Sequence, residues 1–142
     1  VGAAELQAAA QRVGPVTAGT IMSRDLVTVG PDAPAERVAA LFRRHRFTSI
    51  PVAGPDGRYL GMIFQIHMIA TDVRPAGPAA ALMRADMPTA RADTPLGDLL
   101  TLMAEGDVDA VPVLSGPSLV GVVTRTDLIS AFARHDPRGP GG

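Results

Sequence analysis

The stretch IMSRDLVTVGPDAP, residues 21 to 34, occurs a second time in altered form as LMRADMPTARADTP, residues 82 to 95. Identical residues match at a constant offset of 61: Met22 with Met83, Asp25 with Asp86, Thr28 with Thr89, Asp32 with Asp93, and Pro34 with Pro95. The offset extends to SIPV (49 to 52) and AVPV (110 to 113). It becomes 60 after one deleted turn residue, where GMIFQIHM (61 to 68) matches GVVTRTDL (121 to 128). The chain is therefore a tandem duplication, and its two copies are expected to share one local fold.

Each copy predicts the order strand, helix, strand, strand, helix. The first strand is Leu26–Val29. In the second copy, Thr94 as N-cap and Pro95 at the first helical position predict where the next helix begins. In both copies, apolar residues at helical spacing give the helix after the first strand a core face. The turn residues GPDG (54 to 57) join strands over 49–53 and 59–63 into a hairpin, and closing helices are expected over 65–72 and 125–134.

Composition excludes several classes of protein. The chain has 142 residues, of which 46% are hydrophobic, which is enough for a packed core. Its net charge of −1 and pI near 6.3 offer no basic surface for nucleic acid. Without cysteine it can form no disulfide, thiolate nucleophile or cysteine metal site. No apolar stretch approaches the roughly 20 residues that cross a bilayer, so we expect no membrane insertion of this segment.

A three-stranded copy with both helices on one face leaves apolar surface uncovered. We therefore expect an α+β fold in which the two copies, related by a pseudo-twofold axis, pack sheet to sheet with their helices outside. The expected boundaries are an N-terminal helix (Ala3–Arg12) and lead-in over 1–17, a first repeat over 18–72, a linker over 73–78, a second repeat over 79–132, and a flexible tail over 133–142.

The segment GVVTRTDL places a hydroxyl, that of Thr124, three residues before the carboxylate of Asp127. This spacing is typical of a helix capping box, in which each side chain accepts a hydrogen bond from the other residue's N–H. Such a cap contributes about 1 kcal/mol and needs no ligand. The alternative is that the same two side chains bind a ligand, and both interpretations stay open.

The tandem pattern M-x-x-D-h-h-T-h, a helix, h-P-V and G-h-h-T-x-x-D, where h is apolar, resembles a pair of CBS domains, the modules named after cystathionine β-synthase. The likeness covers about residues 18 to 132. It implies a non-catalytic regulatory module with two clefts between the repeats, each able to take AMP, ADP, ATP or S-adenosylmethionine and so to sense energy state. It also implies a homodimer of CBS pairs, a regulated enzyme or transporter domain, and a cytoplasmic location, including that of the cytoplasmic part of a membrane protein.

The resemblance assigns one nucleotide-binding cleft to residues of both repeats: Met22, Val27, Phe47, Thr48, Ser49, Thr124, Thr126 and Asp127. The helix N-terminus at Thr124 suits a phosphate, because it presents free amides and a partial positive charge. The carboxylate of Asp127 only accepts hydrogen bonds, so it suits the two ribose hydroxyls. The adenine is expected between apolar walls such as Val27 and Phe47.

Three departures from the family pattern and one cluster of basic residues bear on binding. Phe64 and His67 replace the threonine and aspartate in the first repeat, so the mirror cleft is expected to be empty or to hold a different ligand. We interpret His67 as a partly buried residue at a helix start, with a ligand contact or pH sensor as the alternative. Asp109 would repel a phosphate. The run RRHR (43 to 46) is interpreted as a solvated helix end, and the alternative is that Arg46 contacts the phosphate and offsets Asp109.

Two functions follow, a regulatory sensor of an adenosyl ligand and a structural dimerisation module without a ligand. Catalysis is not indicated, because the three histidines lie far apart and the chain has neither a nucleophile elbow nor a lysine for a phosphate-binding loop. No group of residues has metal-ligand spacing. We therefore expect no catalytic residue, no metal site and no catalytic cofactor.

Overall fold

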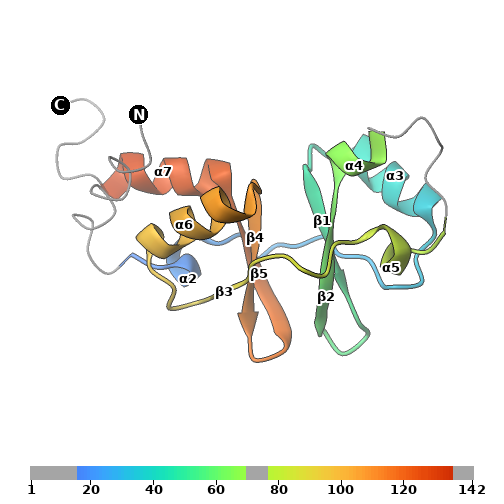
Figure 1. The fold of residues 1–142 in the computed structure, drawn as a ribbon, viewed down its shortest axis with the longest axis horizontal. Helices are drawn as coiled ribbons and strands as arrows, with labels where there is room; N and C mark the ends of the chain where they lie inside the picture. The colour runs from blue at the N-terminus through green and yellow to red at the C-terminus, as the bar shows by residue number, and fades with distance from the viewer. Residues whose placement is uncertain (1–15, 70–76, 136–142) are drawn as a thin grey trace. The chain divides into compact units, whose positions relative to one another are not determined.

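The computed structural model describes residues 16–69 and 77–135, which form two compact units (Figure 1). Within the described residues, unit 1 comprises 16–26, 88–116 and 120–135, and unit 2 comprises 27–69, 77–87 and 117–119. The predicted helix Ala3–Arg12, most of the predicted linker and the residues beyond 135 lie outside the described residues.

Unit 2 is built around the predicted hairpin of β1 (Ser49–Ala53) and β2 (Tyr59–Phe64), which pair antiparallel. Its turn is closed by Gly57, whose φ of 84° favours glycine. Helix α3 (Ala35–Arg44) buries Val38 and Phe42 against this hairpin, as its apolar spacing predicts. Helix α4 (Gln65–Ile69) follows β2 directly, and the short α5 (Ala79–Leu82) comes from the start of the second repeat.

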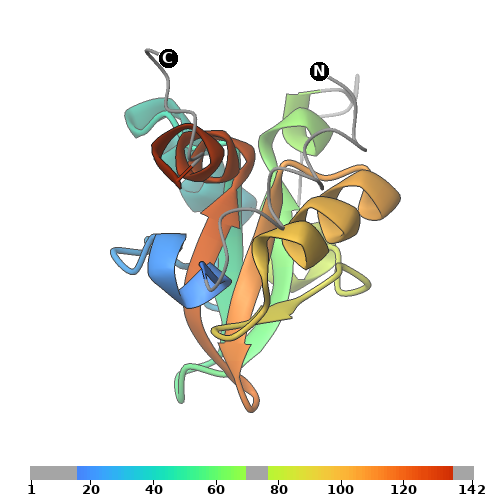
Figure 2. The same ribbon diagram turned by 90° about the vertical axis from the view of Figure 1, so that its left-hand side faces the viewer.

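Unit 1 contains the corresponding elements of the second repeat. Strand β3 (Ala90–Arg91) pairs parallel with β4 (Ala110–Ser115), and β5 (Ser118–Thr124) completes the sheet in the order β3-β4-β5. Helix α6 (Leu96–Gly106) runs beside α7 (Arg125–His135), and the short α2 (Ala18–Ile21) comes from the first repeat (Figures 1 and 2). The core of this unit includes the fully buried side chains Leu96, Leu99, Val111, Val113 and Val123.

Each unit therefore includes a short segment of the other repeat, held by a reciprocal pair of backbone hydrogen bonds. In unit 1 the N–H of Ser23 donates to the carbonyl of Val122 at 2.9 Å, and the return bond is 3.1 Å. In unit 2 Arg84 and Met62, at the equivalent positions, make the same pair at 2.8 and 3.0 Å. Neither repeat completes a compact unit without a segment of the other.

The predicted strand Leu26–Val29 is wrong in extent, because only Val29 pairs. Val29 forms a parallel bridge with Val52, in which its N–H donates to Pro51 at 3.1 Å and its carbonyl accepts from Ala53 at 3.0 Å. Residues 26–28 form no bridge, so the extended segment contributes a single paired residue before the turn that begins at Gly30.

The predicted start of α6 is also corrected. The helix begins at Leu96, and Pro95 occupies the N-cap position with no side-chain cap bond. Thr94 instead stabilises the preceding turn, where its Oγ1 accepts from the N–H of Arg91 at 2.9 Å. A Thr-Pro pair supports either geometry, so local propensity alone could not choose between them.

Substitution of Gly61 tests the close approach of the exchanged segment in unit 2. A Cβ at Gly61 would lie 2.8 Å from both the carbonyl oxygen of Arg84 and the Sδ of Met83, and the backbone atom cannot turn away. We expect Gly61→Ala to lower the free energy of unfolding by about 1–3 kcal/mol, measured by chemical denaturation. Gly30→Ala is the matched control, because a Cβ there meets nothing within 4 Å. Equal stability of the two variants would contradict the close approach.

Tyr59 is expected to control the alkaline stability of the chain. Its hydroxyl is buried with no hydrogen-bond partner among the described residues. Burial, with a further contribution from the charge of Asp86, raises its pKa from 10.0 to about 12. The unfolded chain loses this proton near pH 10 while the folded chain keeps it, so stability falls as the pH rises from 10 to about 12.

The chain has one tyrosine and neither lysine nor cysteine, so no other side chain is expected to titrate in that pH range. Tyr59→Phe should therefore make the free energy of unfolding independent of pH there, and should raise it slightly at neutral pH by removing an unpaired hydroxyl. Thermal unfolding of both proteins between pH 9 and about 12 measures this. A variant that loses stability as steeply as the parent would disprove the assignment.

Candidate functional site

The first turn of α7 carries the predicted capping box. The N–H of Thr124 donates to Oδ2 of Asp127 at 2.9 Å, and the N–H of Asp127 donates to Oγ1 of Thr124 at 3.1 Å. Both residues are half-buried. The cap interpretation is thus confirmed, and the two hydrogen bonds fix the rotamers of both side chains at the end of β5.

The cap leaves hydrogen-bonding capacity on both side chains. Oδ2 of Asp127 is used by the cap, but its Oδ1 accepts no hydrogen bond from the described residues. The hydroxyl of Thr124 accepts in the cap and can still donate its own proton. Cap formation and ligand binding are therefore compatible, because they use different atoms of the same two side chains.

The amides of this helix start are largely occupied. The N–H of Arg125 donates to the carbonyl of Asp109 at 2.8 Å, and that of Asp127 is taken by the cap. Thr126, which is exposed, has the first-turn N–H that no described residue accepts. The same bond from Arg125 brings the half-exposed Asp109 beside the helix start, so this end of unit 1 carries two carboxylates and suits hydroxyl donors better than an anion.

Met22 lies in unit 1 with the cap residues but is only 9% exposed. Its side chain covers Gly121 on β5, where an added Cβ would collide with it. The structure thus gives this predicted site residue a packing role. The glycine that it covers lies three residues before Thr124 on the same strand.

The remaining predicted site residues lie in unit 2. The carbonyl of Thr48 accepts from the N–H of Gln65 at 3.0 Å, which is the counterpart of the bond between Asp109 and Arg125. Thr48 is exposed, and Val27 and Ser49 are half-buried. This end of unit 2 therefore presents hydroxyls where unit 1 presents Asp109.

The residues of the run RRHR (43 to 46) differ in their contacts. The ring of His45 stacks on Phe47 with centroids 4.7 Å apart and an interplanar angle of 23°, a contact that the sequence did not indicate. Arg46 is exposed and makes no ion pair with any described residue. An unpaired guanidinium two residues before Thr48 in the sequence is a candidate anion contact.

The mirror position at the start of α4 lacks the cap chemistry. Phe64 replaces the threonine and is 6% exposed, so its ring is buried. Ile66 stands where the second repeat has Thr126 and is 61% exposed. The side chain of His67 lies outside what the structure describes, so its two interpretations stay predictions.

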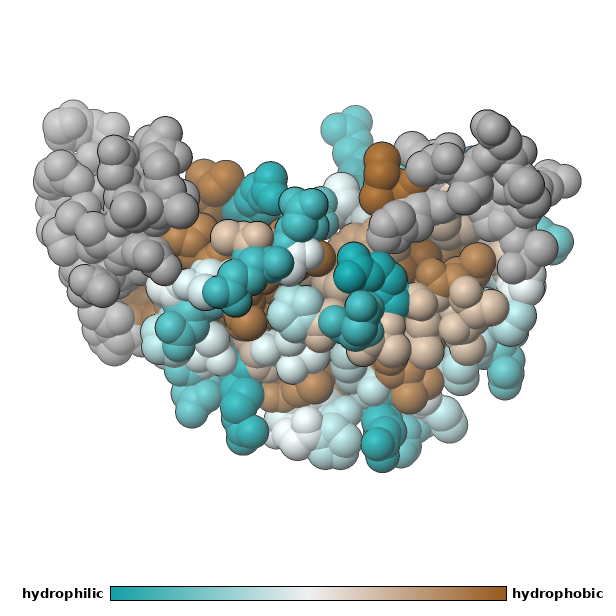
Figure 3. Space-filling model, in the orientation of Figure 1, coloured by the Kyte–Doolittle hydropathy of each residue, from teal (hydrophilic) through white to brown (hydrophobic). Residues whose placement is uncertain are grey.

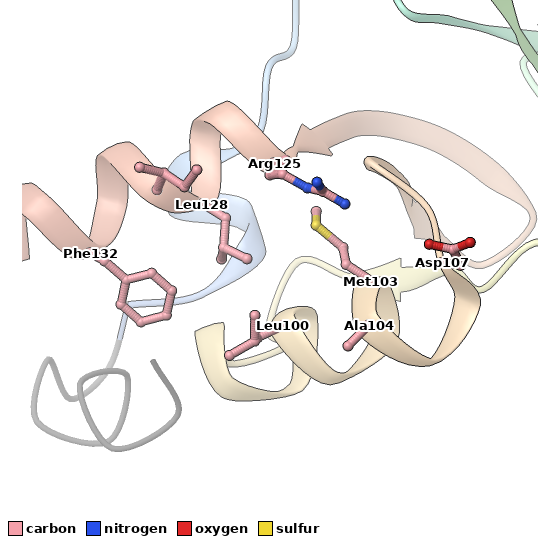
Figure 4. Close-up of a pocket in the computed structure, with 8 residues that line it drawn as sticks. Leu100, Met103, Ala104, Asp107, Arg125, Leu128 and Phe132 are labelled. Atoms are coloured by element: carbon pink, nitrogen blue, oxygen red, sulfur yellow. The ribbon is translucent and has the colours of Figure 1, made fainter. Parts of the chain in front are cut away.

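A groove that sequence reasoning missed lies between α6 and α7 (Figure 4). Its volume is about 230 Å³, and its lining residues are Leu100, Met103, Ala104, Asp107, Arg125, Leu128, Ile129 and Phe132. In Figure 4 Leu128 and Phe132 of α7 and Met103 of α6 point toward the gap between the helices, while Arg125 and Asp107 lie at one end. Asp107 ends α6 in the left-handed conformation, with φ 51° and ψ 49°.

The described residues contain no group of three or more histidine, cysteine, aspartate or glutamate side chains that could hold a metal ion. In the same part of the chain, every helix is too short or too polar to cross a membrane.

The model of the CBS domain family matches residues 18–70 and 79–134. The chain belongs to the CBS domain family. This CBS pair is 32% identical to hypoxic response protein 1 of Mycobacterium tuberculosis over 126 residues, 85% of each chain. It is 27% identical to an uncharacterised protein of Methanocaldococcus jannaschii, but spans only 31% of that protein's length.

Solved structures agree with this CBS pair in fold. Hypoxic response protein 1, solved with two coordinated zinc ions, has a TM-score of 0.73 at 29% identity, over 82% of this chain and 98% of that one. The cytosolic domain of the Mg²⁺ channel MgtE in complex with ATP has a TM-score of 0.71 at 28% identity, over 87% and 52%. CBSX2 in complex with AMP has a TM-score of 0.77 at 22% identity, over 83% and 96%. The predicted α+β CBS fold is thus confirmed.

Substitutions in the cap should show that its two residues act as a pair. We expect Thr124→Val and Asp127→Ala each to lower the free energy of unfolding by about 1 kcal/mol. The double variant should lose less than the sum of the two, because each single change already breaks the reciprocal arrangement. Thr126→Val is the control, since the exposed Thr126 hydroxyl makes no bond with the described residues. Strict additivity in denaturant titrations would contradict the cap.

Proposed function

We propose that this CBS pair is a non-catalytic regulatory module that binds an adenosyl ligand, with Asp127 accepting hydrogen bonds from the ribose hydroxyls. The observation that carries the proposal is that the two carboxylate oxygens of Asp127 have different roles. Its Oδ2 is held by the N–H of Thr124, and Oδ1 has no partner among the described residues. A fixed carboxylate oxygen makes charge-assisted hydrogen bonds at a reduced entropic cost.

The ligand is bound, in this proposal, by the residues that the family resemblance assigns: Met22, Val27, Phe47, Thr48, Ser49, Thr124, Thr126 and Asp127. MgtE, which is 28% identical, was solved with ATP, and this supports an adenine nucleotide as the ligand class. AMP, ADP and S-adenosylmethionine are the other candidates. Zinc is not carried over from hypoxic response protein 1, because the described residues hold no suitable ligand group.

The charges favour one orientation of the ligand. Asp109 and Asp127 make the α7 end of unit 1 acidic, and two of its first-turn amides are already bonded. We therefore assign the ribose hydroxyls to Asp127 and keep Arg46, Thr48 and Ser49 as the candidate phosphate contacts. In this proposal the positive charge of Arg46 compensates the repulsion between the phosphates and Asp109.

The wider proposal includes a homodimer of CBS pairs, a cytoplasmic location, and a regulated enzyme or transporter domain, attached or separate. The second candidate function is a dimerisation module that binds no ligand. It is favoured by Phe64, which belongs to the core where a cap threonine would stand, and by Asp109, which disfavours phosphate.

Calorimetry with AMP, ATP and S-adenosylmethionine tests the proposal. The Asp127→Asn variant keeps an oxygen that can accept from Thr124 but loses the charge, so we expect its affinity to fall about tenfold. A ligand at 100 times its dissociation constant should also stabilise the parent by about 2.7 kcal/mol.

Asp32→Asn is the matched control, because Asp32 is exposed and lies in the turn before α3. It should bind as the parent does. Absence of heat and of thermal stabilisation with all three ligands would favour the ligand-free module. Equal affinity of the Asp127→Asn and Asp32→Asn variants would remove Asp127 from the site.

A further inference from the structure

The two equivalent helices α3 and α6 carry opposite charges at matching positions. At the offset of 61, Arg37 corresponds to Asp98, Arg44 to Glu105 and Arg46 to Asp107. All six side chains are exposed. Residues 35–46 contain four arginines and one glutamate, a net charge of +3, and residues 96–107 contain three acids and no base, a net charge of −3. The duplication has therefore kept the helix and inverted its surface charge.

These charges lie on the outer side of each helix. Arg37 and Arg44 are seven residues apart, so they share one face, and the buried residues Val38 and Phe42 face the core instead. Asp98 and Glu105 have the same spacing on α6, where Leu99 and Met103 are buried. None of the four charged side chains forms an ion pair within the described residues. Each surface is thus available to an external partner of opposite charge.

The acidic surface continues into the apolar groove between α6 and α7. Ile129 lines that groove and is 59% exposed, one of two large hydrophobic side chains that are this exposed among the described residues. Hydrophobic side chains reach the surface among hydrophilic ones in the region of these two helices (Figure 3). Apolar area beside a charged helix is typical of a protein interface.

We propose that the basic α3 surface of one copy binds the acidic α6 surface of a second copy, so that the homodimer is antiparallel, with repeat 1 against repeat 2. The inference rests on the homodimer of the proposed function and adds its orientation. A two-fold axis repeats the contact, because each copy supplies one basic and one acidic surface. The parallel arrangement would place Arg37 and Arg44 against their own copies and Asp98 and Glu105 against theirs, which like-charge repulsion disfavours.

Charge reversal tests the orientation without any ligand, so its outcome is independent of adenosyl binding. One variant carries Arg37→Glu and Arg44→Glu, and the other carries Asp98→Arg and Glu105→Arg. In the antiparallel dimer each variant alone brings like charges together. We expect each to raise the dimer dissociation constant at least about tenfold in sedimentation at low salt. The variant with all four changes restores opposite charges and should return to within about threefold of the parent.

Circular dichroism of each variant checks that it is folded. Recovery in the quadruple variant would also show that the weaker dimerisation of the double variants is not caused by loss of folding. A parallel dimer would give a different pattern. Each double variant would replace one like-charge contact by another, so the dissociation constant would not change. The proposal would be overturned by any of three results: dissociation constants that the double variants leave unchanged, a quadruple variant that does not recover dimerisation, or a parent chain that is monomeric at all concentrations.

Cysteine cross-linking gives an independent measurement, because the chain has no cysteine of its own. Ala40 lies on α3 between the two arginines, Ala104 lies beside Glu105 on α6, and both are exposed. Mixing Ala40→Cys with Ala104→Cys chains and adding a short thiol cross-linker should give mainly the mixed product. Preferential cross-linking of Ala40→Cys chains to each other would contradict the antiparallel arrangement.

Discussion

The structure depends on the exchange of a short segment between the two repeats. Ser23 pairs with Val122 and Arg84 pairs with Met62, so each hairpin gains its neighbour from the opposite repeat. The glycines at 61 and 121 make this approach sterically feasible. Each pairing lies two residues before the end of its strand, where the closing helix begins. The exchange therefore positions both helix starts, including the cap at Thr124, and makes the duplicated chain fold as a pair of mutually dependent units.

Within that shared frame the two repeats have diverged in chemistry. The second repeat keeps a threonine and an aspartate at its helix start, whereas the first has a buried Phe64 and an exposed Ile66 near the same position. The outer helices differ as strongly, with arginines on α3 and acids on α6. A duplication fixes the backbone twice but leaves each exposed side chain free to change. This explains how one fold can carry one capped carboxylate and two surfaces of opposite charge.

Local chemistry was sufficient to predict much of the fold. Gly54 to Gly57 specified a hairpin, and the Thr124 and Asp127 spacing specified the start of α7, because these signals act within four residues. The exchange of segments was not predictable, since it pairs Ser23 with Val122 and Arg84 with Met62, residues of different repeats that no local signal connects. Thr94 was misassigned because a threonine before proline serves a turn as well as a helix. The groove between α6 and α7 and the stacking of His45 on Phe47 depend on side-chain packing, which a periodic pattern does not encode.

In the function proposed for this CBS pair, the capped start of α7 faces a bound adenosyl ligand. Amide hydrogen exchange of the full chain, with and without saturating AMP, ATP or S-adenosylmethionine, tests it most directly. With at least one ligand, we expect slower exchange at residues 125–127 and at residues 48–49, and no such change in the Asp127→Ala variant. Unchanged exchange at the start of α7 in the presence of a ligand that binds would show that this helix start does not face the ligand.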